Sequence, residues 1–327
     1  MTKLLFTLGI ILLGLALGYA VQKLAATGRL RLPLPLSDLR RLLQKVGLLG
    51  CMYVSFLATV WIIRIDNARV AVLPGLGVFT LLLGGALAVG LARLWKLDRR
   101  RSGSYFICGC CSNMGSVGAL VVFVFLGEEA FAYVPIYKLF EEFVYYVIGF
   151  PIARSFSLPA GRAAAEGLRA RLRPLPGDVF VMTAFGAILV GGALNLSGIE
   201  RPEFVRVLNT VMVPTGTFLL LVSIGLAMKF SSVGSCLREC AAMMGIKFLV
   251  LPATACLIGY LLGLGDMHAG LPLKVVLVLA STPVAFTALI PPSIYDLDLN
   301  LANACWLTST LALVVVLPAV YLLVGWM

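Results

Sequence analysis

The sequence is poor in the residues on which soluble proteins and metalloproteins depend. Of its 327 residues only 13% are charged, and His268 is its single histidine. Soluble domains are about half apolar and about a quarter charged, whereas this chain is 61% hydrophobic with a mean hydropathy of +1.02. The composition therefore excludes a water-soluble globular protein.

Signatures of several other classes are also missing from the sequence. It has no G-x-x-x-x-G-K-[ST] run, which argues against an ATP-driven motor. Cys236 and Cys240 form an i,i+4 pair, but no second pair stands at zinc-site spacing, so we expect neither a metal nor another resident cofactor. Strict alternation of apolar and polar residues is absent, and the apolar runs are longer than barrel strands need. An all-α integral membrane protein is the remaining interpretation.

Two short motifs suggest an enzyme alternative, an intramembrane aspartyl protease in which two carboxylates share a proton. They are GLGD at 263–266 and the pair Tyr295-Asp296. Both Asp266 and Asp296 fall at the ends of apolar segments, and the motifs stand in the reverse of the usual order. We therefore expect no enzyme.

Hydrophobic segments follow one another along almost the whole chain. A helix that crosses the hydrocarbon core needs roughly 20 apolar residues. On this basis the sequence predicts ten membrane-spanning helices, at 4–24, 46–63, 70–94, 104–126, 131–153, 178–197, 204–228, 241–263, 273–295 and 301–324.

An internal similarity relates the first and the sixth of these segments. Residues 9–18 (GIILLGLALG) and 186–195 (GAILVGGALN) agree at six of ten positions. This predicts a first five-helix repeat at 1–153, a cytoplasmic basic linker at 154–177 and a second five-helix repeat at 178–327. Because five is odd, the second repeat enters the bilayer inverted, which is the plan of many secondary transporters.

The net charge of +11 is explained by topology rather than by nucleic-acid binding, because no basic run is interleaved with aromatic residues. Lys and Arg gather in alternate connections, the side that the positive-inside rule makes cytoplasmic. We therefore expect both termini outside, in the inner (cell) membrane of a bacterium. The basic residues of these connections are Lys23, Arg29, Arg31, Arg40, Arg41, Lys45, Arg93, Lys96, Arg99, Arg100, Arg101, Arg154, Arg162, Arg169, Arg171, Arg173, Lys229 and Arg238.

Two of the segments carry polar or helix-breaking residues in their middle. In the fourth segment these are Ser112, Asn113, Met114, Gly115 and Ser116. In the ninth they are Ser281, Thr282 and Pro283, after which a second half-helix is expected to begin near Val284. Proline removes a backbone donor and clashes with the preceding turn, and glycine weakens a helix interior.

Interruptions at matching places in two inverted repeats indicate a binding site. Each break frees backbone N–H and C=O groups, which the membrane tolerates only where they line a cavity or meet a ligand. The half-helices that begin after the two breaks would point their positive ends at the site, so we expect an anion there. The alternative is that Gly and Pro merely kink two ordinary helices.

These residues resemble the auxin efflux carrier family, within the bile acid/sodium symporter-like superfamily. The resemblance rests on 111–137 and 279–318. It implies ten spans in an inverted repeat, with spans 4 and 9 crossing at Asn113 and at the Thr282–Pro283 turn, where an organic anion such as auxin or a dicarboxylate binds. It also implies a scaffold and a moving crossover domain, and in some members a dimer. The ninth segment has no Asn at its break, which leaves the substrate and the coupling ion open.

Span 5 places three charges, Lys138, Glu141 and Glu142, within the apolar region, next to Tyr137. A charge at a span centre costs about 2.5–3.5 kcal/mol on insertion scales. Their i,i+3 and i,i+4 spacing allows Lys138 to pair with either carboxylate. In the functional interpretation these residues handle a coupling ion, H⁺ or Na⁺, and Lys138 attracts the anion; in the alternative they form a structural ion pair.

Two further predictions concern other spans. Lys247, nearer a helix end, is expected to extend its ammonium toward the membrane surface. Asn303, with Thr308 and Ser309, is expected to face the site from span 10.

The sequence thus predicts a secondary transporter of a small organic anion that works by alternating access, with the lipid bilayer as its surroundings and a possible homodimer as its assembly. Two alternatives stay open: a sodium-coupled symporter of the bile-acid type, and a receptor that binds its ligand without moving it.

Overall fold

Helices account for nearly all of the regular structure, as the long apolar runs predict. The computed structural model describes residues 2–30, 32–62, 68–158, 179–228 and 234–327. Within these ranges the single strand-like feature is an isolated antiparallel bridge between Ser112 and Val284. Most of the predicted linker, from residue 159 onward, lies outside the described residues, as do Arg31 and Lys229.

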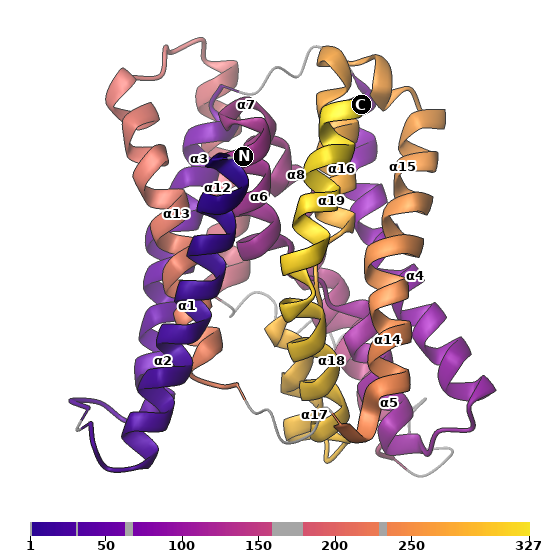
Figure 1. The fold of residues 1–327 in the computed structure, drawn as a ribbon. Helices are drawn as coiled ribbons and strands as arrows, with labels where there is room; N and C mark the ends of the chain where they lie inside the picture. The colour runs from indigo at the N-terminus through magenta and orange to yellow at the C-terminus, as the bar shows by residue number, and fades with distance from the viewer. Residues whose placement is uncertain (1, 31, 63–67, 159–178, 229–233) are drawn as a thin grey trace. The chain divides into compact units, whose positions relative to one another are not determined.

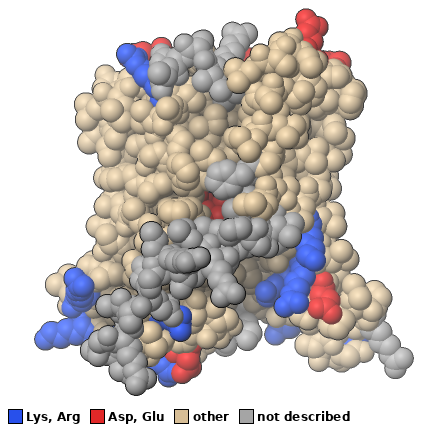
Figure 2. Space-filling model, turned by 180° about the vertical axis from the view of Figure 1, so that it is seen from behind, with Lys and Arg blue, Asp and Glu red and all other residues tan. Residues whose placement is uncertain are grey.

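The described ranges contain five helices that are long and apolar enough to cross a membrane, or six if one bent pair is a single span. The five are Thr2–Ala26, Leu36–Val60, Arg69–Leu94, Glu203–Gly225 and Leu237–Leu261, and the pair is Leu299–Leu311 with Leu313–Trp326, bent by 49°. Figure 2 shows that the Lys and Arg side chains of the face that it draws lie toward its upper and lower ends, whereas its described middle is largely free of them. The count of ten spans and the inverted repeat stay predictions.

The chain folds into two units, and each unit takes segments from both halves of the sequence. The first unit comprises Met1–Asp66, Gly115–Pro135 and Thr183–Met228. The second comprises Asn67–Met114, Ile136–Met182 and Lys229–Met327. Two of the five boundaries fall inside the predicted fourth and fifth segments, and the one between Met114 and Gly115 lies among the residues of the first break.

Long helices dominate the first unit. They are α1 (Thr2–Ala26), α2 (Leu36–Lys45) continuing through a π-helical turn, η1 (Val46–Met52), into α3 (Tyr53–Val60), α12 (Val179–Leu196) and α13 (Glu203–Gly225), together with the shorter α6 (Ala119–Leu126) and α7 (Glu128–Phe131). In Figure 1, α1 and α13 lie side by side. A Cβ atom on Gly18 would come within 2.8 Å of the Gly225 Cα, so small residues set this close contact.

The two similar stretches of the sequence have similar surroundings in this unit. Gly14 of α1 is buried, and a Cβ there would come within 2.8 Å of Leu221 Cβ. Its sequence partner Gly191 would place a Cβ within 2.7 Å of the Leu57 carbonyl oxygen. The other matched pair, Gly9 and Gly186, has open space at both positions.

Broken helices characterise the second unit. Its elements include α4 (Val72–Leu94), α5 (Arg99–Cys110), α9 (Glu141–Phe143), η4 (Val144–Gly149), α10 (Phe150–Ser155), α14 (Leu237–Gly245), η7 (Ile246–Val250), α15 (Leu251–Leu261), α16 (Leu271–Ala280), η10 (Phe286–Leu289), α17 (Ile290–Ile294), α18 (Leu299–Leu311) and α19 (Leu313–Trp326). Helices α4 and α5 pack closely where Gly84 faces Gly109, because a Cβ on either would collide with the other's carbonyl oxygen.

The predicted fifth segment, 131–153, is not one helix. Helix α8 (Tyr133–Tyr137), which crosses the boundary between the units, ends before a turn at 138–140, and α9 begins at Glu141. The interruption falls on the buried charges of this segment. A hydrophobicity average over the segment does not show such a turn, because the flanking residues are strongly apolar.

Candidate functional site

The two predicted breaks meet in the second unit. Helix α5 ends at Cys110, and a π-helical turn, η3 (Met114–Gly118), begins just beyond the break. Helix α16 ends at Ala280, and η10 begins at Phe286. The extended residues between these ends pair with each other, through the bridge between Ser112 and Val284.

Two backbone hydrogen bonds make this pairing. The Asn113 N–H donates to the Pro283 carbonyl oxygen at 2.9 Å, and the Ala285 N–H donates to the Cys111 carbonyl oxygen at 3.2 Å. They flank Ser112 and Val284, which oppose each other without exchanging bonds themselves. The N–H groups of these two residues therefore need other partners.

Each of the two remaining N–H groups donates to a side-chain hydroxyl. The Ser112 N–H donates to the Tyr145 hydroxyl at 2.9 Å. The Val284 N–H donates to the Ser309 Oγ at 3.2 Å. Tyr145 lies in the predicted span after the first break and Ser309 in the span after the second, so the two breaks are supported in the same way.

Lys247 holds the end of α5. Its side chain is completely buried, and its ammonium donates to the carbonyl oxygens of Gly109 (2.8 Å) and Cys111 (2.9 Å) and to the Ser112 Oγ (2.8 Å). The last carbonyls of a helix lack intrahelical partners, and a cation there also interacts favourably with the helix dipole. All three ammonium protons are used.

The prediction that Lys247 extends toward the membrane surface is wrong. The side chain turns inward because the broken end of α5 offers it three acceptor oxygens. The sequence did contain a signal for this inward position. Lys247 is the single lysine of the apolar segment 241–263, and a charged residue within a membrane span usually faces the interior of a helix bundle.

The charges of span 5 form a chain that leads to the same break. The Lys138 Nζ lies 2.7 Å from the Glu141 Oε2 and 3.5 Å from the Glu142 Oε1, so Lys138 makes both of the pairings that the spacing allows. Side chains of Lys138 and Glu141 are 7% exposed, and that of Glu142 is 20% exposed. The Tyr145 hydroxyl lies 2.9 Å from the Glu141 Oε1 and 3.1 Å from the Ser112 carbonyl oxygen. With one proton, the hydroxyl donates to one of these oxygens at a time.

Some predicted residues lie elsewhere. Tyr137 is buried with its hydroxyl 3.2 Å from the Thr80 Oγ1, and the hydroxyl makes no bond to the span 5 charges. Gly115 and Ser116 belong to the first unit, where the Thr217 hydroxyl donates to the Ser116 carbonyl oxygen at 3.5 Å.

Other predicted residues are buried within the second unit. Met114 is buried next to the break, and Ser281 follows the last residue of α16. The Thr282 hydroxyl donates to the Leu279 carbonyl oxygen at 2.8 Å and so serves its own helix end. Asn303 is buried in α18, the helix that also carries Ser309.

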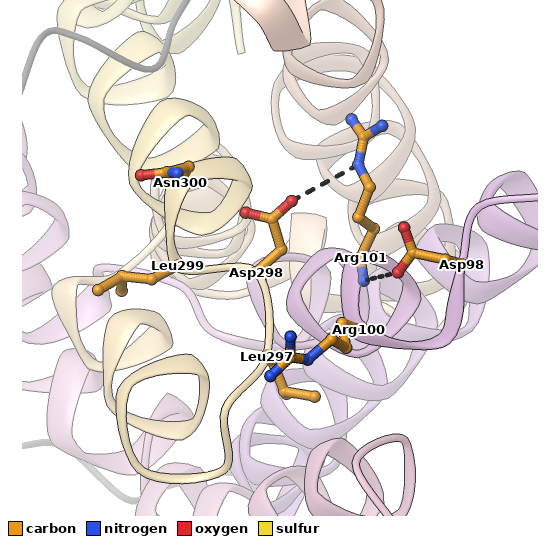
Figure 3. A pocket seen from close by; sticks show the side chains of 7 residues that line it. All are labelled: Asp98, Arg100, Arg101, Leu297, Asp298, Leu299 and Asn300. Carbon is orange, nitrogen blue, oxygen red and sulfur yellow. Dashed lines mark hydrogen bonds and ion pairs between the residues drawn. The ribbon is translucent and has the colours of Figure 1, made fainter.

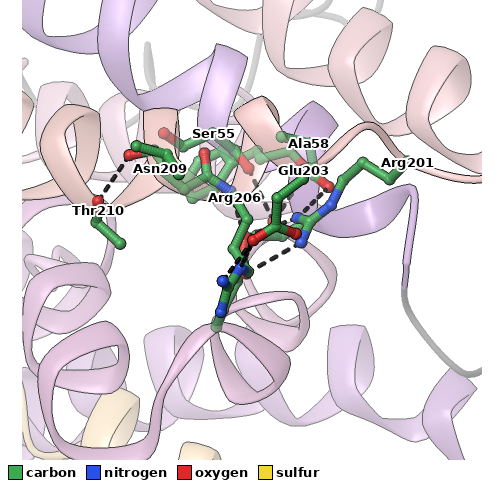
Figure 4. A network of polar contacts seen from close by, with 11 residues as sticks. Ser55, Ala58, Arg201, Glu203, Arg206, Asn209 and Thr210 are labelled. Carbon is green, nitrogen blue, oxygen red and sulfur yellow. Dashed lines mark hydrogen bonds and ion pairs between the residues drawn. The ribbon is translucent and has the colours of Figure 1, made fainter.

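Two other polar regions lie outside the paired breaks. A pocket of about 420 Å³ is lined by Asp98, Arg100, Arg101, Leu297, Asp298, Leu299 and Asn300 (Figure 3). In the first unit, Arg201 donates to both carboxylate oxygens of Glu128 and to the Ala58 carbonyl oxygen, in the network of which Figure 4 shows part. In both regions ion pairs balance opposite charges, through Arg101 with Asp298 and Arg201 with Glu128.

In the part of the chain that the structure describes, no group of three or more His, Cys, Asp or Glu residues is placed to hold a metal ion. Cys108, Cys110 and Cys111 are buried free thiols of α5 and its end.

Comparison with known proteins points to membrane transport. No family model matches the chain. It is 23% identical over 308 residues to a protein of Methanothermobacter thermautotrophicus named an uncharacterized transporter, with 92% of each chain covered. It is 26% identical over 239 residues to a protein of Methanocaldococcus jannaschii with the same description, with 71% of this chain and 72% of the relative covered.

Proposed function

We propose that this protein is a secondary transporter of a small organic anion, and that the paired breaks form its binding site. Two relatives that are named transporters and the apolar helices of the chain support membrane transport in general. The observation that carries the choice of site is the antiparallel pairing of the two broken segments at Ser112 and Val284. Broken helices near the bilayer midplane are the usual place for substrates in secondary transporters.

Positive charge at the breaks favours an anion. The Lys247 ammonium lies directly at the first break, and its contacts there are neutral oxygens. A helical segment also begins at Met114, on the far side of the same break, and helix N-termini attract negative charge. A carboxylate of the substrate is the simplest chemical group to complement this site.

Coupling to an ion is assigned to the chain of Lys138, Glu141 and Tyr145. It connects a buried carboxylate to the backbone of the first break by hydrogen bonds of 2.9 Å on both sides of the Tyr145 hydroxyl. A change in the protonation of Glu141 would therefore be felt at Ser112. The inverted arrangement of the halves, with both termini outside, completes the proposal. The equivalent roles of Tyr145 and Ser309 support the repeat, and the basic residues of alternate connections support the placement of the termini.

The experiment is uptake of labelled mono- and dicarboxylates into proteoliposomes, after a thermal-shift screen has chosen the ligands. Asn113→Ala is expected to lower uptake to the protein-free background while the purified protein keeps its melting temperature. Asn300→Ala, in α18 outside the breaks, is the matched control and should transport normally. Normal uptake by Asn113→Ala removes this site assignment.

The same assay separates the alternatives. Uptake that depends on a sodium gradient would favour the bile-acid-type symporter. Ligand binding in the thermal-shift screen with no uptake of any bound ligand would favour a receptor.

A further inference from the structure

The contacts of Lys247 are those of a cation bound by backbone oxygens. Two carbonyl oxygens and one hydroxyl oxygen, from Gly109, Cys111 and Ser112, converge on its Nζ at 2.8–2.9 Å. In transporters with broken helices, unwound carbonyls and half-helix C-terminal ends are the groups that coordinate a coupling Na⁺. In this protein the C-terminal end of α5 is a position of this kind, and the Lys247 ammonium occupies it.

The ammonium is not neutralised by a carboxylate within the described ranges. Its hydrogen bonds go to neutral oxygens, and Glu141 and Glu142 pair with Lys138 instead. The dipole of α5 contributes about half a negative charge at this end, so part of the lysine charge remains uncompensated. A lone charge in a membrane span is costly and is retained where it serves a site.

Several features of the fold hold the lysine in this position. Lys247 lies in the π-helical turn η7, where one extra residue is accommodated in the helix. The contact between Gly84 and Gly109 brings the α5 end close to α4, which a larger residue at either position would prevent. The Cys111 carbonyl oxygen accepts from both Lys247 and Ala285, so the ammonium touches an oxygen that also joins the two breaks.

We propose that Lys247 is a built-in cation that closes the broken end of α5, takes the place of a bound alkali ion there and makes this break independent of sodium. The inference rests on the proposed function, which it deepens by assigning the ion requirement of the site. The lysine stabilises the extended residues 111–113 permanently, whereas a bound ion would do so only while it is present.

The test compares two variants that remove the same charge and differ in the space that they leave. Lys247→Ala opens room at the three oxygens for a small cation. Lys247→Met removes the charge but fills that room with an apolar side chain. Lys274→Ala, a lysine of α16 with no bond to the break, is the control. Melting temperatures are measured in detergent, without substrate, in NaCl, in N-methylglucamine chloride and in methylammonium chloride at equal ionic strength.

The proposal predicts that the wild type and Lys274→Ala melt at the same temperature in all three salts. Both Lys247 variants should melt about 10 °C lower in N-methylglucamine chloride. Sodium or methylammonium should restore at least half of that loss in Lys247→Ala and none of it in Lys247→Met. A purely structural lysine would give no cation-specific difference between the two variants, and that result overturns the proposal.

A second measurement does not require a folded variant. If millimolar sodium raises the melting temperature of the wild type above that in N-methylglucamine, an alkali ion binds in addition to the lysine, and the proposal fails. Because no substrate is present, these results are independent of whether organic anions are transported. If no organic anion is taken up but sodium or methylammonium still restores the melting temperature of Lys247→Ala, the proposed function is refuted and the role of Lys247 is not.

Discussion

The two units of the molecule differ in how their helices are interrupted and where their buried charges lie. In the first unit the helices α1 and α13 are uninterrupted, and α2, η1 and α3 follow without a break. In the second unit, breaks divide the fourth, fifth and ninth predicted segments. The charged residues that are buried within the described ranges all lie in this second unit: Lys138, Glu141, Glu239 and Lys247.

The difference distinguishes charges that stabilise from charges that are free to act on a ligand. In the first unit Arg201 and Glu128 neutralise each other through bonds of 2.6 and 3.1 Å. In the second, the three hydrogen bonds of the Lys247 ammonium go to uncharged oxygens, so no carboxylate among these contacts neutralises its charge. Breaks and uncompensated charge occur together because interrupted backbone supplies the oxygens that such a charge needs.

The largest expected effect concerns the close helix contacts, which occur within each of the two units. Gly84→Leu in the second unit and Gly18→Leu in the first should each destabilise the protein by about 3 kcal/mol or more, because the side chain would enter a neighbouring backbone. The measurement is the yield of monodisperse protein on size-exclusion chromatography. Gly90→Leu, at an open position of the same helix as Gly84, should express normally. Equal yields for Gly84→Leu and Gly90→Leu would show that α4 and α5 do not pack as described.

The next effect tests the buried pair of the second unit. Glu141→Gln removes the shorter of the two ion pairs of Lys138, and breaking a buried pair costs about 3–5 kcal/mol. We expect a clearly lower melting temperature and an altered pH dependence of uptake. Glu142→Gln should be milder, since that side chain is more exposed.

The exposed pair of the first unit serves as its control. Glu203→Gln removes an ion pair with Arg206 on the surface, where such pairs contribute about 0–1 kcal/mol. If Glu141→Gln is as mild as Glu203→Gln, and pH dependence is unchanged in both glutamate variants of span 5, the buried charges have a structural role only.

The smallest effect concerns the support of the break. Tyr145→Phe removes the acceptor of the Ser112 N–H, and a buried unpaired donor costs about 1–3 kcal/mol. Uptake should fall about tenfold or more, because that free energy is lost at the site itself. Tyr146→Phe, whose ring packs on Phe150, is the matched control. Similar uptake in the two variants would argue against a role for Tyr145 at the break.

The sequence by itself determined the helical, membrane-embedded class and the positions of both breaks. Apolar runs favour helices, and Pro283 and the run from Ser112 to Ser116 weaken them, whatever the surroundings. The spacing of Lys138 from Glu141 and Glu142 fixed their possible pairing in the same way. These are local properties, which a sequence states directly.

Only the tertiary structure decided how the breaks are held. The bond from Ser112 to Tyr145 joins residues 33 positions apart, and the bond from Lys247 to Gly109 joins residues 138 apart. The direction of a buried lysine depends on which oxygens the fold places within its reach, and not on its distance from a helix end. For that reason the sequence predicted that Lys247 extends toward the membrane surface, whereas in the fold its ammonium lies at the break.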